Sequence, residues 1–144
     1  MKAELTDLKK FSIFDGLDDR ELQLIVEHVK EETYRKGSRI FEEKALAINL
    51  YMVIEGKIAI KMGNREVDYV EPGEICGWST VTEPYTFTAA AWAAEETRAL
   101  VVRGEVLRDI FKKNTHIGYL VMKEIASVIS RRLKALRYRL SETR

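Results

Sequence analysis

The middle of the chain alternates between apolar and polar residues over short stretches. Ile48–Ile54 is a β-branched and aromatic run, while Lys57–Lys61 and Glu66–Val70 place apolar side chains at every second position. Glycine-containing turn signals separate these stretches, a pattern typical of antiparallel strands. Residues 30–102 are therefore predicted to form an all-β sandwich or barrel, with further strands at Phe87–Ala94 and Thr97–Val102.

The segment before the strands, residues 1–29, is predicted to hold helices. Its first apolar repeat at helical spacing consists of Leu5, Leu8 and Phe11. Thr6 or Asp7 is a candidate cap for this first turn. Asp18 followed by Glu21 is a capping-box pattern. The apolar stripe after it predicts a helix over about residues 19–29, with one face packed onto the barrel.

The segment after the strands, residues 103–144, is also predicted to be helical. Residues 104–113 form one helix, and a longer one begins at Asn114 or Thr115 and continues to Leu140. Steps of three and four define a heptad seam along this helix, made of Tyr119, Met122, Ala126, Ile129, Leu133, Leu136 and Leu140. A second stripe, suited to packing against the helix's own barrel, consists of Val121, Ile125 and Val128.

A helix with two apolar stripes requires two partners. We therefore expect a homodimer through the C-terminal helix; the alternative is that both stripes serve the core of one monomer. The segment from Lys123 to Arg144 contains seven basic residues and two acidic ones. We interpret its charges, including Arg131 and Arg132, as the solvated face of a coiled coil.

Composition narrows the function classes. The 144 residues, 46% hydrophobic and 33% charged, fit a single globular domain over 1–144. A net charge of +1 argues against a dedicated nucleic-acid binder. The longest apolar runs, such as Ala89 to Ala94, are too short to span a bilayer, and no signal-peptide pattern is present. A single cysteine excludes an internal disulfide framework. We expect a cytoplasmic protein without membrane attachment.

One stretch carries the clearest functional signal. It runs from Gly73 to Val81 and continues from Pro84 to Ala91. Two glycines four residues apart, small hydroxyl residues and a run of alanines predict a tight turn. Such a turn brings backbone N–H groups close to a ligand, where they can form an anion nest.

This stretch resembles the phosphate-binding cassette of the cyclic nucleotide-binding domain in the catabolite activator (CRP/FNR-like) superfamily. Gly37, the run Tyr51–Gly56 and the pair Pro72-Gly73 match that family in order and spacing. The resemblance implies a mainly β jelly roll, of the cupin-like double-stranded β-helix type, with N-terminal helices and a long C-terminal dimerisation helix. The chain ends where the activators begin their helix-turn-helix, so we expect no sequence-specific nucleic-acid binding.

The family's two most important ligand contacts are absent from the matching positions. A Glu that binds the ribose hydroxyl is replaced by Trp78, and the phosphate-binding Arg falls on Thr88, or on Thr86 with a shorter loop. No Arg or Lys occurs between Arg65 and Arg98. The candidate ligand-binding residues are therefore Gly77, Trp78, Ser79, Thr80, Thr86, Thr88 and Ala89. Trp78 is expected either to stack on a flat ligand or to fill the space.

Catalytic patterns are not found. His28 and His116 lie on separate predicted helices, so we expect no metal site and no cofactor. Cys76 has no neighbouring base in sequence and is interpreted as a buried, inert thiol. The leading hypothesis is a non-enzymatic sensor that binds cyclic AMP or cyclic GMP weakly or not at all, with a cyclic nucleotide or another small anion as possible effector. The alternative is a ligand-free module with a filled pocket that docks an unidentified protein.

Overall fold

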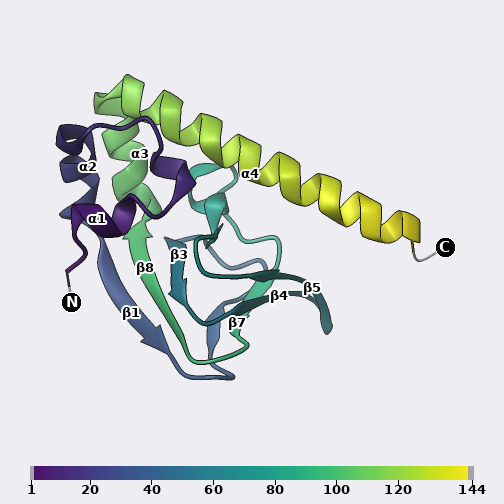
Figure 1. Cartoon of the computed structure of the whole chain (residues 1–144). Helices are drawn as coiled ribbons and strands as arrows, with labels where there is room; N and C mark the ends of the chain where they lie inside the picture. Colours follow the sequence, from purple (N-terminus) through teal and green to yellow (C-terminus); the bar gives the residue numbers. More distant parts are fainter. Residues whose placement is uncertain (1, 143–144) are drawn as a thin grey trace.

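The fold consists of two antiparallel four-stranded sheets with helices at both ends (Figure 1). It is described by a computed structural model that covers residues 2–142. The first sheet has the order β1-β8-β3-β6, with bounds Lys30–Tyr34, Thr97–Arg103, Asn49–Glu55 and Ile75–Cys76. The second has the order β2-β7-β4-β5, with bounds Arg39–Phe41, Ala90–Ala93, Ile58–Met62 and Arg65–Val70. The predicted jelly roll is confirmed.

One predicted strand is shorter than expected. The alternation predicted a strand over Phe87–Ala94, but β7 begins only at Ala90. The backbone of Phe87 instead accepts a hydrogen bond from the Lys44 N–H at 2.8 Å and donates one to the Ala45 carbonyl at 2.9 Å. Its hydrogen-bonding groups are therefore used by the loop that follows β2, which excludes it from the sheet.

The N-terminal helices cover one end of the barrel. Helix α1 spans Leu5–Leu8, and a 3₁₀ helix, η1, spans Ser12–Phe14. The predicted cap of α1 at Thr6 or Asp7 is wrong, because Glu4 occupies the N-cap position and Asp7 is the third helical residue. Both hydrogen bonds of the predicted capping box are present at the start of α2, Asp19–Val26. This helix ends at residue 26 instead of 29, since the chain turns there to enter β1.

Two C-terminal helices follow β8. Helix α3 spans Gly104–Lys113, and α4 spans Thr115–Glu142 and extends beyond the barrel (Figure 1). The predicted second stripe does pack inward: Val121 and Ile125 are fully buried, and Val128 packs against the same core. Within residues 2–142 no helix is long and apolar enough to cross a membrane.

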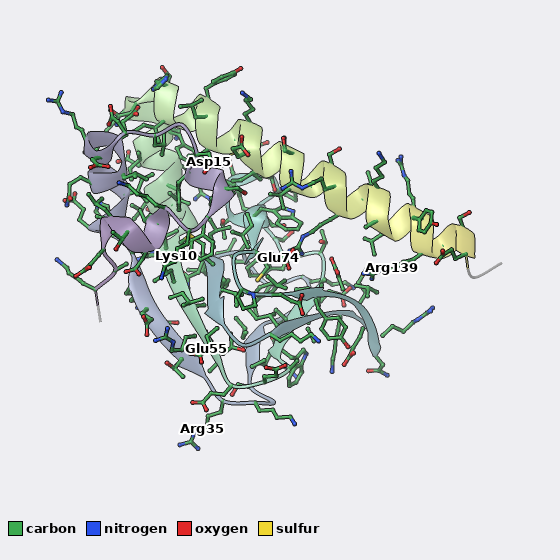
Figure 2. All side chains as sticks on the ribbon, viewed as in Figure 1. Lys10, Asp15, Arg35, Glu55, Glu74 and Arg139 are labelled. Carbon is green, nitrogen blue, oxygen red and sulfur yellow. The ribbon has the colours of Figure 1, made fainter. Side chains whose placement is uncertain are left out.

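The apolar interior has two parts. One lies between the N-terminal helices, α3, α4 and the first sheet, and the other lies between the two sheets around Tyr51, Val53 and Ile58. Charged side chains such as Arg35 and Glu55 project from the end of the barrel opposite the helices, and Arg139 lies on the side of α4 near the strands (Figure 2). This leaves α4 lying across the edge of β5 and the turn after β6, where the candidate site forms.

Candidate functional site

The tight turn of the cassette is made by a left-handed residue at its second glycine. Gly77 has φ +86°, and a Cβ at this position would lie 2.7 Å from the Asn49 carbonyl oxygen, so only glycine fits. The turn leads into a 3₁₀ helix, η2, at Trp78–Val81. The hydroxyl of Thr80, which is fully buried, donates to the Gly77 carbonyl at 2.9 Å. The predicted tight turn is therefore present, and Thr80 closes it from the inside.

Helix α3 holds the cassette from behind. The guanidinium of Arg108 donates to the Thr80 carbonyl and lies 4.2 Å from the centre of the Tyr85 ring. Gly104, the first residue of α3, approaches so closely that an added Cβ would be 2.4 Å from the Thr80 Cβ. The position of η2 is thereby linked to the start of the two C-terminal helices.

A cavity of about 190 Å³ opens in front of the cassette. It lies between η2, the strands β2, β4 and β5, the loop before β7, and α4. Its lining consists of Phe41, Ile60, Met62, Val67, Asp68, Cys76, Gly77, Trp78, Ser79, Phe87, Thr88, Ala89, Arg132 and Leu136. Phe41 and Phe87 stack with ring centres 3.7 Å apart and form an aromatic wall.

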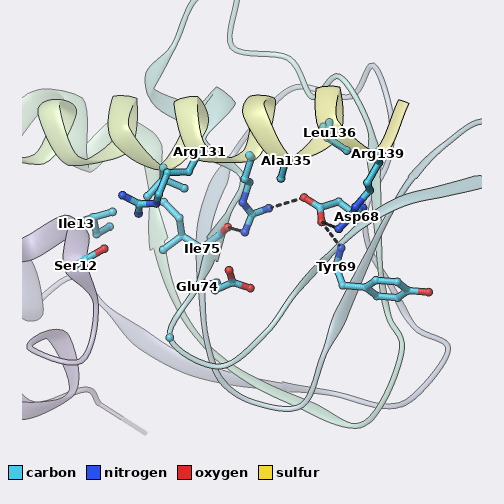
Figure 3. Close-up of a pocket in the computed structure, with 13 residues that line it drawn as sticks. Ser12, Ile13, Asp68, Tyr69, Glu74, Ile75, Arg131, Ala135, Leu136 and Arg139 are labelled. Carbon is cyan, nitrogen blue, oxygen red and sulfur yellow. Dashed lines mark hydrogen bonds and ion pairs between the residues drawn. The ribbon is translucent and has the colours of Figure 1, made fainter. Parts of the chain in front are cut away.

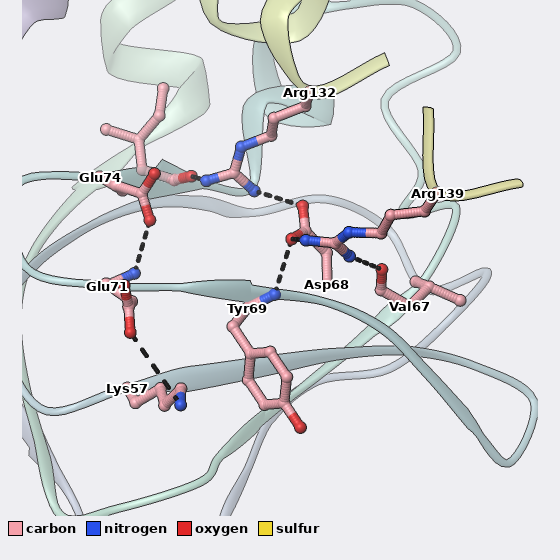
Figure 4. Close-up of polar contacts among 9 residues, drawn as sticks. Lys57, Val67, Asp68, Tyr69, Glu71, Glu74, Arg132 and Arg139 are labelled. Atoms are coloured by element: carbon pink, nitrogen blue, oxygen red, sulfur yellow. Dashed lines mark hydrogen bonds and ion pairs between the residues drawn. The ribbon is translucent and has the colours of Figure 1, made fainter. Parts of the chain in front are cut away.

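Arg132 is the cation of this cavity, and it comes from α4. Its Nη2 donates to the Ile75 carbonyl at 3.1 Å, and its Nη1 lies 3.5 Å from the Asp68 carboxylate (Figure 4). The guanidinium also lies 5.2 Å from the centre of the Trp78 ring. Only 14% of its side chain is exposed. Our interpretation of this basic segment as a solvated face is therefore wrong for Arg132.

A second arginine of α4 joins the same carboxylate. Arg139 donates to the Val67 carbonyl at 3.2 Å, and its Nη2 lies 3.9 Å from Asp68 (Figure 4). Asp68 is thus shared by two guanidinium groups. These contacts hold the far part of α4 against β5 at the edge of the cavity.

Cys76 lies in the cavity wall as a buried free thiol. Its side chain is 2% exposed, and burial raises the pKa of the thiol to about 12. The predicted burial of Cys76 is confirmed, and the raised pKa disfavours the thiolate form that reactivity requires.

A larger cavity of about 290 Å³ lies between α4, η1 and the turn after β5 (Figure 3). It shares Asp68, Arg132 and Leu136 with the first cavity. Its charged lining residues include Glu74, Arg131 and Arg139. The Glu74 carboxylate accepts a hydrogen bond from the Glu71 N–H at 2.8 Å. Of the cassette stretch, only Gly73, Glu74 and Ile75 line this space. The turn at Gly77 and the residues after it line the smaller cavity, so we place the candidate site there.

The structure separates the predicted site residues into two groups. Gly77, Trp78, Ser79, Thr88 and Ala89 line the cavity. Thr80 points into the turn, and Thr86 pairs with Leu46 in an isolated antiparallel bridge. Across residues 2–142 no group of three or more His, Cys, Asp or Glu side chains could hold a metal ion.

The polar residues on the α4 side were missed by the sequence reasoning. Asp68 and Ile75 precede Arg132 by 64 and 57 residues, so no local motif connects them. The available signal was indirect. A basic residue within a helix that flanks a cassette without a cation is a candidate for reaching into it.

The sequence of this chain was compared with protein families and with known proteins. The profile described as the cyclic nucleotide-binding domain matches residues 31–114. The chain is 26% identical over 132 residues to the cyclic AMP receptor protein of Thermus thermophilus, and 24% identical over 134 residues to a CRP-like cAMP-activated global transcriptional regulator of Mycobacterium tuberculosis. Each match covers 88% of this chain, which spans 59% and 57% of those two relatives.

Solved structures show the same fold. A candidate cyclic nucleotide-binding protein from Geobacter metallireducens is 30% identical, with a TM-score of 0.86 over 91% of this chain and 98% of that one. The catabolite activator protein of Thermus thermophilus is 25% identical, with a TM-score of 0.71 over 92% of this chain and 62% of its own. A cyclic nucleotide-binding domain from Methylobacillus flagellatus has a TM-score of 0.85 at 14% identity, over 100% of this chain and 88% of that one, and supports the fold alone.

Proposed function

This chain belongs to the cyclic nucleotide-binding domain family, and we propose that it is a non-catalytic regulatory module that senses a small effector. The observation that carries the proposal is the cavity in front of the cassette, because its lining includes both cassette residues and residues of α4. An effector there would border both the cassette residues and Arg132, whose guanidinium lies 5.2 Å from the centre of the Trp78 ring. Binding would therefore shift the equilibrium between positions of α4, which is the output of the module.

We propose further that cyclic nucleotides are weak ligands. Trp78 stands where the family has its ribose-binding Glu, and Thr88 lines the cavity where a phosphate-binding Arg is expected. A charge-assisted hydrogen bond is worth about 1.5–3 kcal/mol, so losing it weakens binding about ten- to a hundred-fold. Isothermal calorimetry should find no cyclic AMP or cyclic GMP binding tighter than about 100 µM. Micromolar binding of either nucleotide would contradict this prediction.

The sensing role is tested through α4. Native mass spectrometry of freshly purified protein would identify a co-purifying small molecule. Hydrogen exchange, measured before and after that molecule is removed, should then differ over residues 128–139, because these residues border the site. Identical exchange with the cavity occupied and empty would count against a sensor.

We also propose that the protein acts in the cytoplasm as a homodimer through α4. Supporting the dimer, several residues of the predicted seam are exposed in the single chain: Tyr119 at 65%, Leu133 at 47% and Leu140 at 70%. Curated relatives described as a cyclic AMP receptor and a transcriptional regulator support a regulatory role. Sequence-specific nucleic-acid binding is not part of the proposal for these 144 residues.

One observation favours a second candidate function. Arg132 already contacts Trp78, Asp68 and the Ile75 carbonyl, so the protein itself holds α4 against the barrel. In this alternative the module needs no effector and presents a fixed surface to a partner protein. A crystal structure with protein side chains filling the cavity would favour this candidate, while electron density for a small molecule would favour the sensor.

A further inference from the structure

The walls of the cassette cavity are mainly apolar. Apart from Asp68, Arg132 and the hydroxyls of Ser79 and Thr88, the lining is aromatic, aliphatic or sulfur-containing, with one glycine. The volume of about 190 Å³ is below the roughly 300–1,000 Å³ of common small-molecule pockets. A matching ligand is therefore small and has an apolar body that packs against the stacked rings of Phe41 and Phe87.

Asp68 and Arg132 line this cavity, and a third charge, Arg139, lies beside them in the lining of the larger cavity. Asp68 is one carboxylate shared by the guanidinium groups of Arg132 and Arg139. No other carboxylate in the described part of the chain lies within ion-pair distance of these arginines. The trio therefore carries one positive charge in excess. Since the Arg132 side chain is 14% exposed, water screens this charge poorly and an anion in the cavity is attracted more strongly.

Arg132 also has hydrogen-bonding capacity left. A guanidinium has five N–H donors, and within residues 2–142 Arg132 uses one on Ile75 and one on Asp68. Its other donors have no hydrogen-bond partner among these residues, and the Ser79 and Thr88 hydroxyls lie in the same lining. A planar carboxylate is the group that a guanidinium binds best.

We infer that the effector is a small monoanion with an apolar body, such as an aromatic or short aliphatic carboxylate, and that Arg132 binds its charged group. This inference rests on the proposed sensor function and names the ligand class of that site. Arg132 thereby supplies from α4 the cation that the cassette lacks. A carboxylate held by Arg132 joins the cassette cavity to α4 by an ion pair. A second negative charge is disfavoured, because Asp68 stands in the same wall.

The test compares charged probes with neutral probes of the same shape. Benzoate and octanoate are titrated beside benzamide and octanamide, with cyclic AMP as reference. Trp92→Phe leaves Trp78, in the cavity wall, as the single tryptophan and its fluorescence as the local readout. We expect at least one carboxylate to bind about ten- to a hundred-fold tighter than its amide, the range of one charge-assisted hydrogen bond.

The matched variants are Arg132→Gln and Arg131→Gln. These neighbouring arginines differ in position: Arg132 lines the cassette cavity, and Arg131 lines only the larger one. The first change should remove the preference for the carboxylate, and the second should leave it intact. Arg132→Lys keeps the charge without the planar fork and should give an intermediate affinity. It also serves as the test if Arg132→Gln does not fold, which thermal unfolding would reveal.

The outcomes separate this inference from the proposed function. If the amides or cyclic AMP bind at least as tightly as the carboxylates, or if Arg132→Gln keeps the carboxylate preference, the ligand class is wrong while a sensing site remains. If no carboxylate binds but native mass spectrometry finds another molecule in the cavity, the ligand class is again wrong. If no probe changes Trp78 fluorescence and no molecule co-purifies, both the inference and the sensor function fail.

Discussion

Two glycines fix the position of the cassette. Gly77 is required by its φ of +86° and by the nearby Asn49 carbonyl, and Gly104 is required by the approach of Thr80. Both constraints act on the backbone and do not depend on which ligand is bound. The conformation of the cassette turn is therefore fixed whichever ligand the cavity accepts.

The first residue-scale prediction concerns Gly104→Ala. Gly104 begins α3, where alanine is intrinsically better than glycine by up to about 1 kcal/mol. Here the new Cβ would lie 2.4 Å from the Thr80 Cβ and 2.8 Å from its carbonyl oxygen. We expect the free energy of unfolding, measured with urea, to fall by about 1–3 kcal/mol as in other overpacked sites. An unchanged or higher value would show that α3 and η2 are not tightly joined.

The second residue-scale prediction restores the family's contacts. The double substitution Trp78→Glu with Thr88→Arg returns a carboxylate and a cation to the cassette. Because Thr88 lines the cavity, the guanidinium of an arginine at this position would have access to a bound phosphate. We expect the affinity for cyclic AMP, measured by calorimetry, to rise about tenfold or more, the value of one charge-assisted hydrogen bond.

The control for this experiment is Trp78→Glu with Thr86→Arg. Thr86 lies in the bridge with Leu46 and does not line the cavity, so an Arg there should give no gain. A gain with Thr86→Arg and none with Thr88→Arg would show that the cassette is aligned two residues away from our assignment.

The sequence was informative about single residues where the constraint is local. The turn at Gly77 follows from two glycines near small residues, and the inert Cys76 follows from the absence of a neighbouring base. The role of Arg132 depends on partners 57 and 64 residues earlier in the chain. Its charge pattern alone matches that of an exposed helix face, so sequence periodicity could not identify it.

At the scale of elements, helices and strands were predictable where side-chain periodicity and backbone hydrogen bonding agree. The capping box of α2 and the inner stripe of α4 are examples. The prediction failed at Phe87, whose apolar alternation continues into β7 while its backbone pairs with the loop after β2. Whether the backbone of Phe87 pairs with a strand or with a loop depends on the tertiary fold, and the local pattern of apolar and polar residues does not reveal it.

The start of α2 carries an element-scale prediction about pH. The Asp18 N–H, and after it the His116 side chain, hydrogen-bond the Glu21 carboxylate and hold its pKa below the ordinary 4.5. The folded state then binds fewer protons than the unfolded state, so this contribution is present above about pH 4.5 and is lost as pH falls. Glu21→Gln should lower the free energy of unfolding by about 1 kcal/mol at pH 7, a typical capping value, and by less at pH 3.

Glu27→Gln is the control for that experiment. Glu27 lies at the other end of α2 with 53% of its side chain exposed, and its change should alter stability by less than about 0.5 kcal/mol. Urea unfolding of the three proteins at both pH values provides the measurement. A cost of Glu21→Gln that grows toward pH 3 would refute the assigned role of the ionised carboxylate.

At the scale of the whole molecule, α4 connects every proposed activity. Its inner stripe packs on the core together with Met122 and Ile129 of the predicted seam, and Leu136 of the seam lines the cassette cavity. Arg132 and Arg139 hold the helix to Asp68 of β5, and the seam residues Tyr119, Leu133 and Leu140 are exposed. A ligand that changes the contacts of Arg132 therefore changes the support of the same helix that carries the seam. In a dimer this would connect the two effector sites through one shared helix pair.

The last prediction tests that helix pair through Leu133→Lys. Leu133 is 47% exposed in the single chain, as expected for a seam residue that becomes buried only when the dimer forms. A buried leucine contributes about 1.5–3 kcal/mol, and a two-fold interface would contain the new lysine twice, against apolar neighbours. Analytical ultracentrifugation should show a dimer for the parent and a monomer for the variant. The control variant Lys134→Ala changes a neighbouring residue that is not part of the seam, and it should remain dimeric. A stable dimer is expected to have a Kd below about 50 µM, so a parent that is monomeric at that concentration would exclude the interface.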